Sequence, residues 1–260
     1  MIRMFIDYDN LKISYIQKKP YCILKIDNFY TDYGYYKVLE NFPTVEDIRK
    51  ENLTEYNNKY YFNSDSNFYK KIITDNKILK DFHNSIFNIK LLKFFYSKLF
   101  FHFISARKLD LFSLCRLFKL PAYEIKELSY FSKFFFNKIR PIVEFSYIFD
   151  GGKVVPHTDN KNKLLSLLTY FPDENKNFNN NLNLGTKFWK SKIKNYNNIH
   201  YKNDLETQFI SESELVYNTP FDKKNLYGFI KNEYSWHSVE KINLNKNVSR
   251  KSINISLLID

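Results

Sequence analysis

The sequence predicts an α+β fold in which a mostly helical first half supports an antiparallel, β-rich second half. Two observations carry this prediction. Residues 66–136 are rich in Leu, Phe and Lys, and their apolar residues recur at helical spacing. From Pro141 onward, short apolar runs are separated by polar, turn-like segments, as in proteins built from short antiparallel strands. Because 260 residues can bury a substantial core in one unit, we expect a single domain over residues 1–260.

The first half, residues 1–140, is expected to contribute an opening strand and then mainly supporting helices. We expect the strand in YCILKIDNFY at 21–30. The most apolar segment, LLKFFYSKLFFHFI at 91–104, contains two lysines and a histidine and falls short of the roughly 20 apolar residues that span a bilayer. We therefore expect a buried, aromatic-rich helix there and no membrane segment.

The second half, residues 141–260, is expected to form a small antiparallel barrel or a jelly roll. Its expected strands are PIVEFSYIF (141–149), KLLSLLTYF (163–171), GTKFWK (185–190), NLYGFIK (225–231), SWHSVEKI (235–242) and SRKSINISLLI (249–259). The Asn-rich segment DENKNFNNNLN at 173–183 is poor in large apolar residues, so we expect an exposed, mobile loop.

The formal net charge of +12 would ordinarily suggest a nucleic-acid or anionic partner. Here the excess is nearly all lysine, and it accompanies abundant Asn, Ile, Phe and Tyr, residues that share A/T-rich codons. The basic clusters, such as KFWKSKIK at 187–194, are short and scattered. We therefore expect a solvated basic surface. A nucleic-acid-binding protein is the alternative, and it predicts binding that falls steeply with salt.

The cysteines and the start of the chain indicate a cytoplasmic setting. Cys22 and Cys115 lie far apart, without a CxxC pair or zinc-like spacing, so neither a disulfide framework nor a zinc finger is indicated. The first residues, MIRMFIDYDNLKISYIQKK, contain no continuous apolar region and no small-residue cleavage site of a secretion signal.

Three residues have the spacing of a metal site. His157 and Asp159 stand two apart, so in an extended segment both side chains would point to the same side. This pair alone carries little weight, because five His and 28 acidic residues give roughly 0.5 His-x-Asp/Glu matches by chance. His237, in a strand-like run far downstream, would complete the two-histidine, one-carboxylate set that holds non-haem iron(II) and leaves positions open.

A basic residue follows on the last expected strand. Arg250 would present a planar, permanently charged fork that can form paired hydrogen bonds with a carboxylate. Ser252 and Asn254 alternate with it, so all three side chains should share one face of the strand. Pairing of Arg250 with a surface acid such as Glu240 or Asp260 is the alternative interpretation.

The order and spacing of these motifs resemble the iron(II)- and 2-oxoglutarate-dependent oxygenases, in particular the prolyl 4-hydroxylase-like branch. The resemblance covers roughly residues 141–259 and rests on YIFDGGKVVPHTD, LLSLLTYF, LGTKFW, SWHSVEKI and SRKSINISLL in that order. YCILKIDNFY and the later NFP also resemble the start of this branch. The resemblance implies a double-stranded β-helix (jelly-roll) core with a helical layer.

The resemblance also implies roles for individual residues. Three match the metal ligands of the group: His157, Asp159 and His237. Arg250 matches the residue that binds the distal carboxylate of 2-oxoglutarate, with Ser252 as its hydrogen-bonding neighbour. Tyr147 matches a position where a tyrosine often contacts the cosubstrate, and Tyr170 is a second such candidate; for both tyrosines, a core position is the alternative. Asn254, on the face of Arg250 and Ser252, is grouped with these four. The chain departs from the usual pattern at Gly185 and Thr186, where the group commonly has a Gly-Gly pair.

The implied reaction is hydroxylation of a prolyl or other peptidyl residue, or of a small molecule. It would consume 2-oxoglutarate and O2 at iron(II), release succinate and CO2, and use ascorbate as a supporting reductant. A carboxylate at Asp159 argues against a halogenase, which leaves that ligand position vacant. Ser256 stands where the nucleic-acid demethylase pattern has a second arginine. A non-catalytic jelly roll with a binding or structural role is the alternative, and it predicts no iron binding. Substrate and oligomeric state stay open.

Overall fold

The computed structural model describes residues 4–50, 54–107, 139–172, 184–193, 203–243 and 249–259. Helices and antiparallel sheets are combined in these parts, as the composition of the two halves predicted. The Asn-rich segment at 173–183, expected to be a mobile loop, lies outside the described residues, as does the end of the expected helical region beyond residue 107. No helix within the described ranges is both long and apolar enough to cross a membrane.

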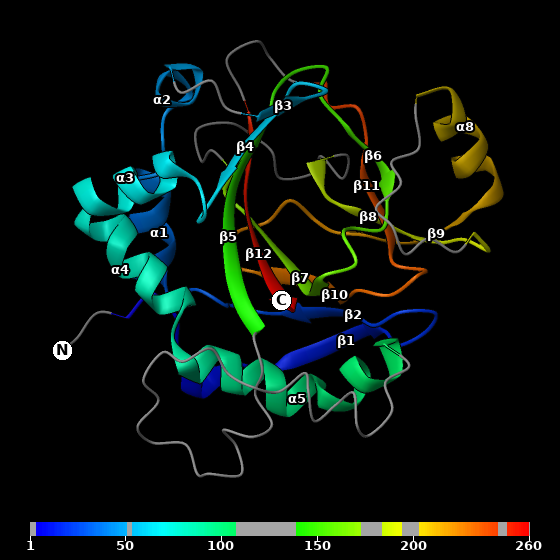
Figure 1. Ribbon diagram of the computed structural model, residues 1–260, viewed down its shortest axis with the longest axis horizontal. Helices are drawn as coiled ribbons and strands as arrows, with labels where there is room; N and C mark the ends of the chain where they lie inside the picture. The colour runs from blue at the N-terminus through cyan, green and yellow to red at the C-terminus, as the bar shows by residue number, and fades with distance from the viewer. Residues whose placement is uncertain are drawn as a thin grey trace.

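An eight-stranded antiparallel sheet runs through the middle of the molecule, in the order β1-β2-β10-β7-β12-β5-β4-β3 (Figure 1). Its strands are β1 (Ile13–Gln17), β2 (Ile23–Ile26), β3 (Thr54–Tyr56), β4 (Lys59–Asn63), β5 (Ile139–Ile148), β7 (Lys163–Tyr170), β10 (Leu226–Ile230) and β12 (Arg250–Ile259). The four central strands come from the second half of the chain. The first half adds two strands at each edge, so one continuous sheet joins both halves.

A four-stranded antiparallel sheet lies beside the large one, in the order β6-β11-β8-β9. Its strands are β6 (Val154–His157), β8 (Lys187–Lys190), β9 (Glu214–Asn218) and β11 (Trp236–Val239). Along the chain, β5, β7, β10 and β12 join the large sheet, whereas β6, β8, β9 and β11 join the small one. Successive segments of the second half therefore cross repeatedly between two sheets.

The first half contains more strand than its composition predicts. We expected one opening strand, and the segment at 21–30 does contain β2, but β1, β3 and β4 also form. The hairpin of β3 and β4 has a local signal. Asn57 and Asn58 join the two strands, and both have positive φ (51° and 55°), as the favoured two-residue hairpin turns require. Asparagine adopts this conformation more readily than most residues.

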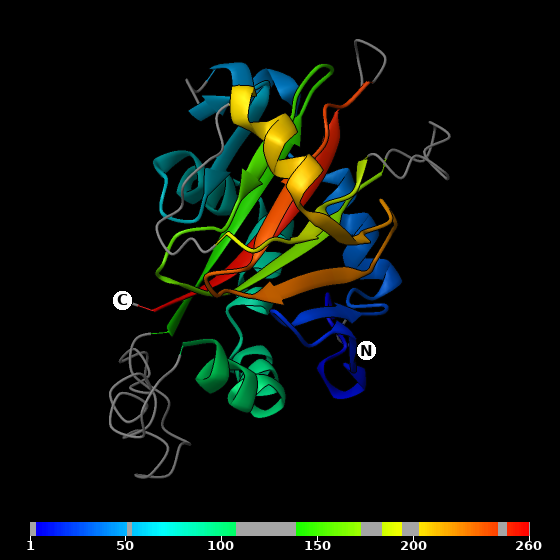
Figure 2. The ribbon, with the colours of Figure 1, turned by 90° about the vertical axis from the view of Figure 1, so that its right-hand side faces the viewer.

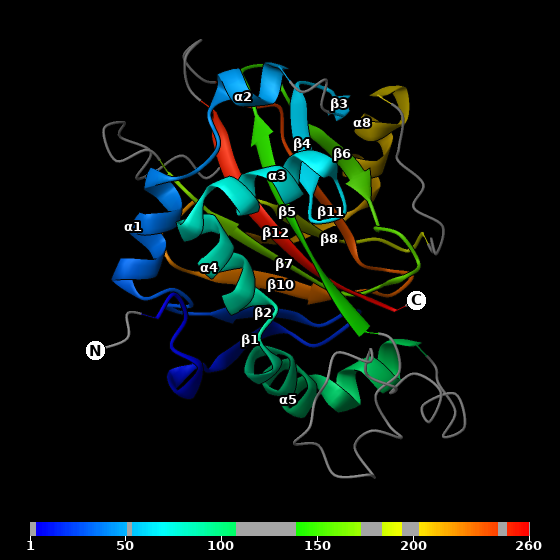
Figure 3. The ribbon, with the colours of Figure 1, turned by 60° about the vertical axis from the view of Figure 1, so that its left-hand side comes forward.

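Helices cover the outer face of the large sheet, the face turned away from the small sheet (Figure 3). They are α1 (Asp32–Glu40), α2 (Val45–Lys50), α3 (Asn67–Asp75), α4 (Lys77–Ile86) and α5 (Ile89–Arg107), with a short 3-10 turn, η1 (Tyr8–Asn10), before them. Polar caps fix three of the helix starts. Thr31, Ser66 and Asn76 each accept a hydrogen bond from the backbone N–H three residues later, at α1, α3 and α4.

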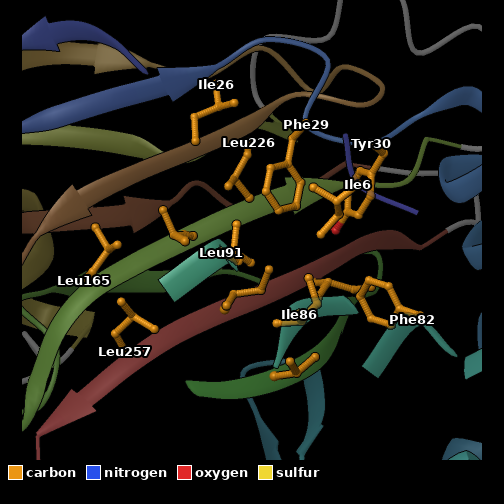
Figure 4. Close-up of a cluster of buried hydrophobic side chains, with 14 of the residues drawn as sticks. Ile6, Ile26, Phe29, Tyr30, Phe82, Ile86, Leu91, Leu165, Leu226 and Leu257 are labelled. Atoms are coloured by element: carbon orange, nitrogen blue, oxygen red, sulfur yellow. The ribbon is translucent and has the colours of Figure 1, made fainter. Parts of the chain in front are cut away.

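The main hydrophobic core lies between this outer face and the helices. Alternate residues of β5 and β12 point into it: Val143, Phe145, Tyr147, Ile253, Ile255 and Leu257. Figure 4 shows Leu165, Leu226 and Leu257 from the sheet facing Phe82 and Ile86 of α4. Burial of each such side chain contributes about 1.5–3 kcal/mol of transfer free energy. This core therefore fixes the strands whose opposite face carries the candidate site.

The segment at 91–104 is helical, as expected, but only one side of it is buried. Leu91, Phe95, Leu99 and Phe103 recur every four residues along α5 and face the core. Phe101, by contrast, is 80% exposed. The expected buried, aromatic-rich helix therefore forms with one side in the core and the other side exposed, because α5 packs at the lower edge of the large sheet (Figure 1).

The small sheet is covered on its outer side by α8 (Asn203–Glu212), which the sequence patterns did not predict (Figure 2). Phe209 of α8 packs against Trp189 and Trp236, which are paired on β8 and β11. The indole N–H of Trp236 donates to the carbonyl oxygen of Ile193 at 2.9 Å. The inner side of the small sheet is therefore the side that faces the large sheet.

Candidate metal centre

The two predicted histidine ligands meet across the small sheet. His157 ends β6, His237 lies in β11, and the two form a directly opposed antiparallel pair. Their ring centroids are 4.1 Å apart. Asp159 follows β6 closely, and one ligand atom from each of the three residues lies within 4.8 Å of the others. The fold therefore brings together three residues that are dispersed in the sequence.

Asp159 reaches the histidines by a route that the sequence did not predict. We expected His157 and Asp159 to point to the same side of one extended strand. The strand ends at His157, however, and Asp159 has φ of 57°, in the left-handed region. Aspartate tolerates this conformation better than most residues. The turn, and not strand alternation, therefore directs the carboxylate toward the two rings.

Backbone carbonyl groups orient both imidazole rings. The Nδ1 atom of His157 lies 2.9 Å from the carbonyl oxygen of Val155, and that of His237 lies 3.0 Å from the carbonyl oxygen of Ser235. Because a carbonyl oxygen only accepts, each Nδ1 must carry the proton and donate. Burial lowers the pKa of His237, which favours the neutral ring. A neutral ring that is protonated at Nδ1 keeps a lone pair on Nε2. The Nε2 atoms of His157 and His237 lie 3.7 and 3.8 Å from the carboxylate oxygens of Asp159.

The Asp159 carboxylate is held from both sides. Lys163 donates to Oδ1 at 2.8 Å, and Ser166 donates to Oδ2 at 2.7 Å; both residues belong to β7. Burial by itself would raise the pKa of Asp159, but the charge and the hydrogen bond of Lys163 lower it, and the pKa lies far below its ordinary value. The group is therefore a carboxylate, the form that binds a metal ion.

The donor set fits a divalent transition metal. Two neutral imidazole nitrogens and one carboxylate, gathered on one side of an ion, form the facial arrangement found at non-haem iron(II) sites. Each of the three residues is no more than 9% exposed, and each is positioned by a further hydrogen bond, as metal ligands commonly are. Three donors also leave coordination positions for other ligands.

Arg250 lies in the same cavity, at the start of β12. Its Nε donates to the carbonyl oxygen of Leu184 at 2.5 Å, and its Nη atoms donate to Ser252 Oγ at 3.2 Å and Thr186 Oγ1 at 3.3 Å. The side chain is buried, and no carboxylate pairs with it in the described parts of the chain. Glu240, a partner we had considered, is bonded to Lys187 instead. A buried cation with only neutral partners is costly unless an anion joins it.

Tyr170 lies beside Arg250 and holds it in place. The guanidinium carbon of Arg250 lies 4.9 Å from the centroid of the tyrosine ring, a cation–π arrangement. The hydroxyl group of Tyr170 donates to Thr186 Oγ1 at 2.9 Å and shares a 2.7 Å hydrogen bond with Thr219 Oγ1. Gly185 permits this close packing, because a Cβ atom there would lie 1.7 Å from the carbonyl oxygen of Thr219.

Tyr147 does not fit the role that the resemblance implied. It lies on the outer face of β5, opposite the cavity, and packs against Phe42. Its hydroxyl group donates to the carbonyl oxygen of Pro43 at 2.6 Å. Strand alternation explains this placement, because Ser146 and Ile148 face the cavity and Tyr147 must therefore face the helices. Tyr147 is therefore a core residue.

The cavity lies between the two sheets, and both the Asp159 carboxylate and the Arg250 guanidinium group line it. It is lined by the metal-ligand candidates from the small-sheet side and by Arg250, Ser252, Asn254 and Ser256 from β12. The three predicted β12 residues thus share a face, as alternation requires. Asn254 is bonded to Glu144 of β5 at 2.7 Å. The cavity has a volume of about 110 Å³ and is partly open to solvent.

Several residues of the site had not been identified from the sequence. Thr186, a departure from the usual pattern of the resembling group, contacts Arg250 and Tyr170 directly. Lys163 and Ser166 were parts of an expected strand but were not assigned to the site. Glu144 was likewise part of an expected strand, although a charged residue in an otherwise apolar run is a signal for an inward-facing polar group.

No protein-family model and no curated protein matches this sequence. Among solved structures, the chain is similar to a prolyl 4-hydroxylase from Phytophthora capsici, with 8% identity and a TM-score of 0.47 over 91% of this chain and 58% of that one. A Pseudomonas putida prolyl 4-hydroxylase has 9% identity and a TM-score of 0.41, over 93% of this chain and 94% of that chain. A 2OG-Fe(II) oxygenase family oxidoreductase from Burkholderia pseudomallei has 10% identity and a TM-score of 0.26, covering 52% and 53%. The chain spans under two thirds of the first of these proteins, and the function has to be argued from the site.

Proposed function

We propose that this protein is an iron(II)- and 2-oxoglutarate-dependent dioxygenase that hydroxylates a prolyl or other peptidyl residue, or a small molecule. One observation carries the proposal: a buried arginine with only neutral partners in the described residues shares a cavity with two histidines and a carboxylate whose ligand atoms lie within 4.8 Å of one another. The cavity thus combines a metal site that has open positions with a separate cationic site. A dicarboxylate such as 2-oxoglutarate matches both sites, because one end can chelate the metal and the other carboxylate can pair with Arg250.

We further propose that β5 to β12 form a double-stranded β-helix, the jelly roll that the motifs suggested. The alternation of these eight strands between the two sheets supports this topology. In such a fold the inner faces of both sheets line one cavity. The proposed ligands come from the inner side of the small sheet, and Arg250 comes from the inner side of the large sheet.

In this proposal His157, Asp159 and His237 hold iron(II), and Arg250 binds the distal carboxylate of 2-oxoglutarate. When bound, iron(II) with 2-oxoglutarate and O2 supplies an oxidant for a C–H bond of the substrate, with release of succinate and CO2. The protein contributes positioning. Val155 and Ser235 carbonyl oxygens fix the imidazole rings, while Lys163 and Ser166 restrain the carboxylate.

The Arg250 guanidinium group, proposed to bind 2-oxoglutarate, is also held in position before the anion binds. Ser252, Thr186 and Leu184 accept hydrogen bonds from the guanidinium group, and Tyr170 packs against its face. These contacts restrict the fork to one orientation before the anion arrives. Less conformational freedom is then lost on binding, which strengthens recognition of the carboxylate.

Replacement of Arg250 tests the proposal. For Arg250→Ala, titration of 2-oxoglutarate into the iron(II)-loaded protein under anaerobic conditions should show weaker binding by roughly 30-fold or more, because a charge-assisted pair to a carboxylate is lost. Iron(II) affinity should stay nearly unchanged. Arg250→Lys should recover part of the loss, since charge persists without the two-pronged geometry. Succinate formation, assayed with ascorbate present, should follow the same order.

Arg140→Ala is the matched control, because Arg140 is partly exposed and bonded to Asp65 at the surface. Equal affinity of the wild type and Arg250→Ala for 2-oxoglutarate would place the anion site elsewhere. If the wild type binds neither iron(II) nor 2-oxoglutarate, the protein is a non-catalytic jelly roll with a binding or structural role.

A further inference from the structure

The cavity extends beyond the metal centre and Arg250 to a second polar cluster on β4, β5 and β12. Glu144 is its centre. One carboxylate oxygen, Oε1, accepts from Asn254 at 2.7 Å and from Lys59 at 3.3 Å. The other oxygen, Oε2, has no hydrogen-bond partner among the residues that the structure describes. We call Glu144 and Asn254 the acceptor subsite.

Asn254 presents a second unpaired acceptor. Its side-chain nitrogen is committed to Glu144, because turning the amide over would set two oxygens against each other. Its Oδ1 atom is therefore fixed as an acceptor, and this atom is buried without a hydrogen-bond partner in the described parts of the chain. An unpaired buried acceptor is rare in native proteins and calls for an explanation.

The acceptor subsite and the metal centre are neighbours in the same cavity. Glu144 lines the cavity together with Asp159 and with Lys163, the residue that donates to Asp159. A molecule bound at the acceptor subsite would therefore lie close to the metal centre.

Neither cosubstrate can satisfy these two acceptors. At neutral pH 2-oxoglutarate offers only carboxylate and keto oxygens, which accept hydrogen bonds, and O2 carries no hydrogen. The missing donor must come from another molecule. Lys59 forms an ion pair with Oε1 of Glu144 at 3.3 Å, which leaves Oε2 available.

We propose that the acceptor subsite binds an N–H donor group, an amine or an amide, of the hydroxylated substrate. This inference rests on the proposed function for its place in a reaction, although the binding itself does not need the metal. Glu144 and Asn254 thereby determine which substrates enter the cavity. Compounds without a hydrogen-bond donor at this position leave Asn254 Oδ1 buried and unpaired, and they bind less well.

Four small probes can test the subsite in the full-length protein. N-methylacetamide and methylammonium carry N–H donors, whereas N,N-dimethylacetamide and tetramethylammonium match them in charge type but have none. Saturation-transfer NMR on the methyl signals reports binding of each probe without any turnover. We expect the donor probes to bind the wild type and the two donor-free probes to fail. Preference for the amide or the ammonium probe identifies which source of N–H the site accepts.

Glu144→Gln should reduce binding of the preferred donor probe about tenfold, because a charged acceptor becomes a neutral amide. Glu214→Gln, at an exposed surface acid paired with Lys190, is the matched control. If Glu144→Gln does not fold, Asn254→Leu removes the second acceptor and should weaken the same probe. Equal binding of all four probes, or a donor signal unchanged in the variant, overturns the proposal and leaves water as the donor.

The same samples separate this inference from the proposed function. Iron(II) and 2-oxoglutarate titrations report the oxygenase site through Arg250 and the metal ligands, and the probes report Glu144. If the donor probes bind but iron(II) and 2-oxoglutarate do not, the acceptor subsite is supported and the oxygenase function is rejected. If iron(II) and 2-oxoglutarate bind but the protein shows no preference for donor probes, the oxygenase function is supported and the acceptor subsite is rejected.

Discussion

The two faces of β5 and β12 differ in what they contribute. On the outer face, Val143, Phe145 and Ile253 pack into the aromatic core beneath the helices. On the inner face of the same strands, Glu144, Ser146, Ser252, Asn254 and Ser256 face the cavity. The backbone is shared, so the difference arises from side chains alone.

On β5 and β12, the buried polar groups without a hydrogen bond in the described ranges lie on the inner face. Arg250 has no acidic partner, and Ser146 Oγ and Asn254 Oδ1 are buried without hydrogen bonds in the described parts of the chain. Such groups destabilise a fold, and packing of the outer face offsets them. The outer face therefore contributes mainly to stability, and the inner face contributes the side chains of the candidate site. Substitutions on the two faces test this division.

The largest expected effect on folding belongs to the outer face. Phe145 is packed among four other rings, those of Phe42, Phe62, Tyr69 and Phe82. Phe145→Ala should lower the free energy of unfolding by about 3–5 kcal/mol, measured by urea denaturation of the metal-free protein. Iron(II) affinity of the folded variant should stay near the wild-type value. Phe101→Ala, at the exposed ring of α5, should change little; a large loss of metal affinity in Phe145→Ala would break the division.

At the candidate metal centre, we expect a large change in iron(II) affinity and a small change in the free energy of unfolding. His237→Ala removes one of three proposed ligands, so iron(II) affinity should fall by on the order of 100-fold or more, about 2.7 kcal/mol. The metal-free variant should unfold within about 1 kcal/mol of the wild type, since one buried hydrogen bond is lost. Anaerobic metal titration and urea denaturation measure the two quantities. His102→Ala serves as the control, and undiminished affinity in a folded His157→Ala, His237→Ala double variant would remove the site assignment.

The smallest effect is expected at Ser146. Its hydroxyl group has no hydrogen bond to lose within the described ranges, so Ser146→Ala should change the free energy of unfolding by no more than about 0.5 kcal/mol. Ser166→Ala should cost more, about 1 kcal/mol, because its hydroxyl group bonds Asp159 at 2.7 Å. Thermal unfolding of both variants side by side measures the difference. A strongly destabilised Ser146→Ala would mean that the inner face also holds the fold together.

Local patterns in the sequence were enough to place many of these features. The expected strands around β5, β7, β8, β10, β11 and β12 all form, because each is a short apolar run between turn-like segments. Arg250, Ser252 and Asn254 share a face, because side-chain direction alternates along any extended chain. The same alternation shows that Tyr147 cannot share the face of Ser146. The resemblance to the oxygenases nevertheless implied a cosubstrate contact for Tyr147.

Other features could not be read from such patterns. β9 and α8 carry weak local signals and are stabilised by neighbours, as Phe209 is by Trp189 and Trp236. Asp159 reaches the histidines through a left-handed turn that a strand pattern does not encode. The contacts of Arg250 with Leu184 and Thr186 join segments far apart along the chain.

The sequence by itself determined which residues alternate, which faces are apolar and which residue types could bind a metal and a carboxylate. Only the tertiary structure decided that His157 pairs with His237, that Arg250 has no acidic partner within the described ranges, and that Glu144 and Asn254 line the same cavity as the candidate metal ligands. The reason is physical. The direction of a side chain depends on its own backbone and immediate neighbours, whereas the surroundings of a face depend on which distant strands pair and in what register.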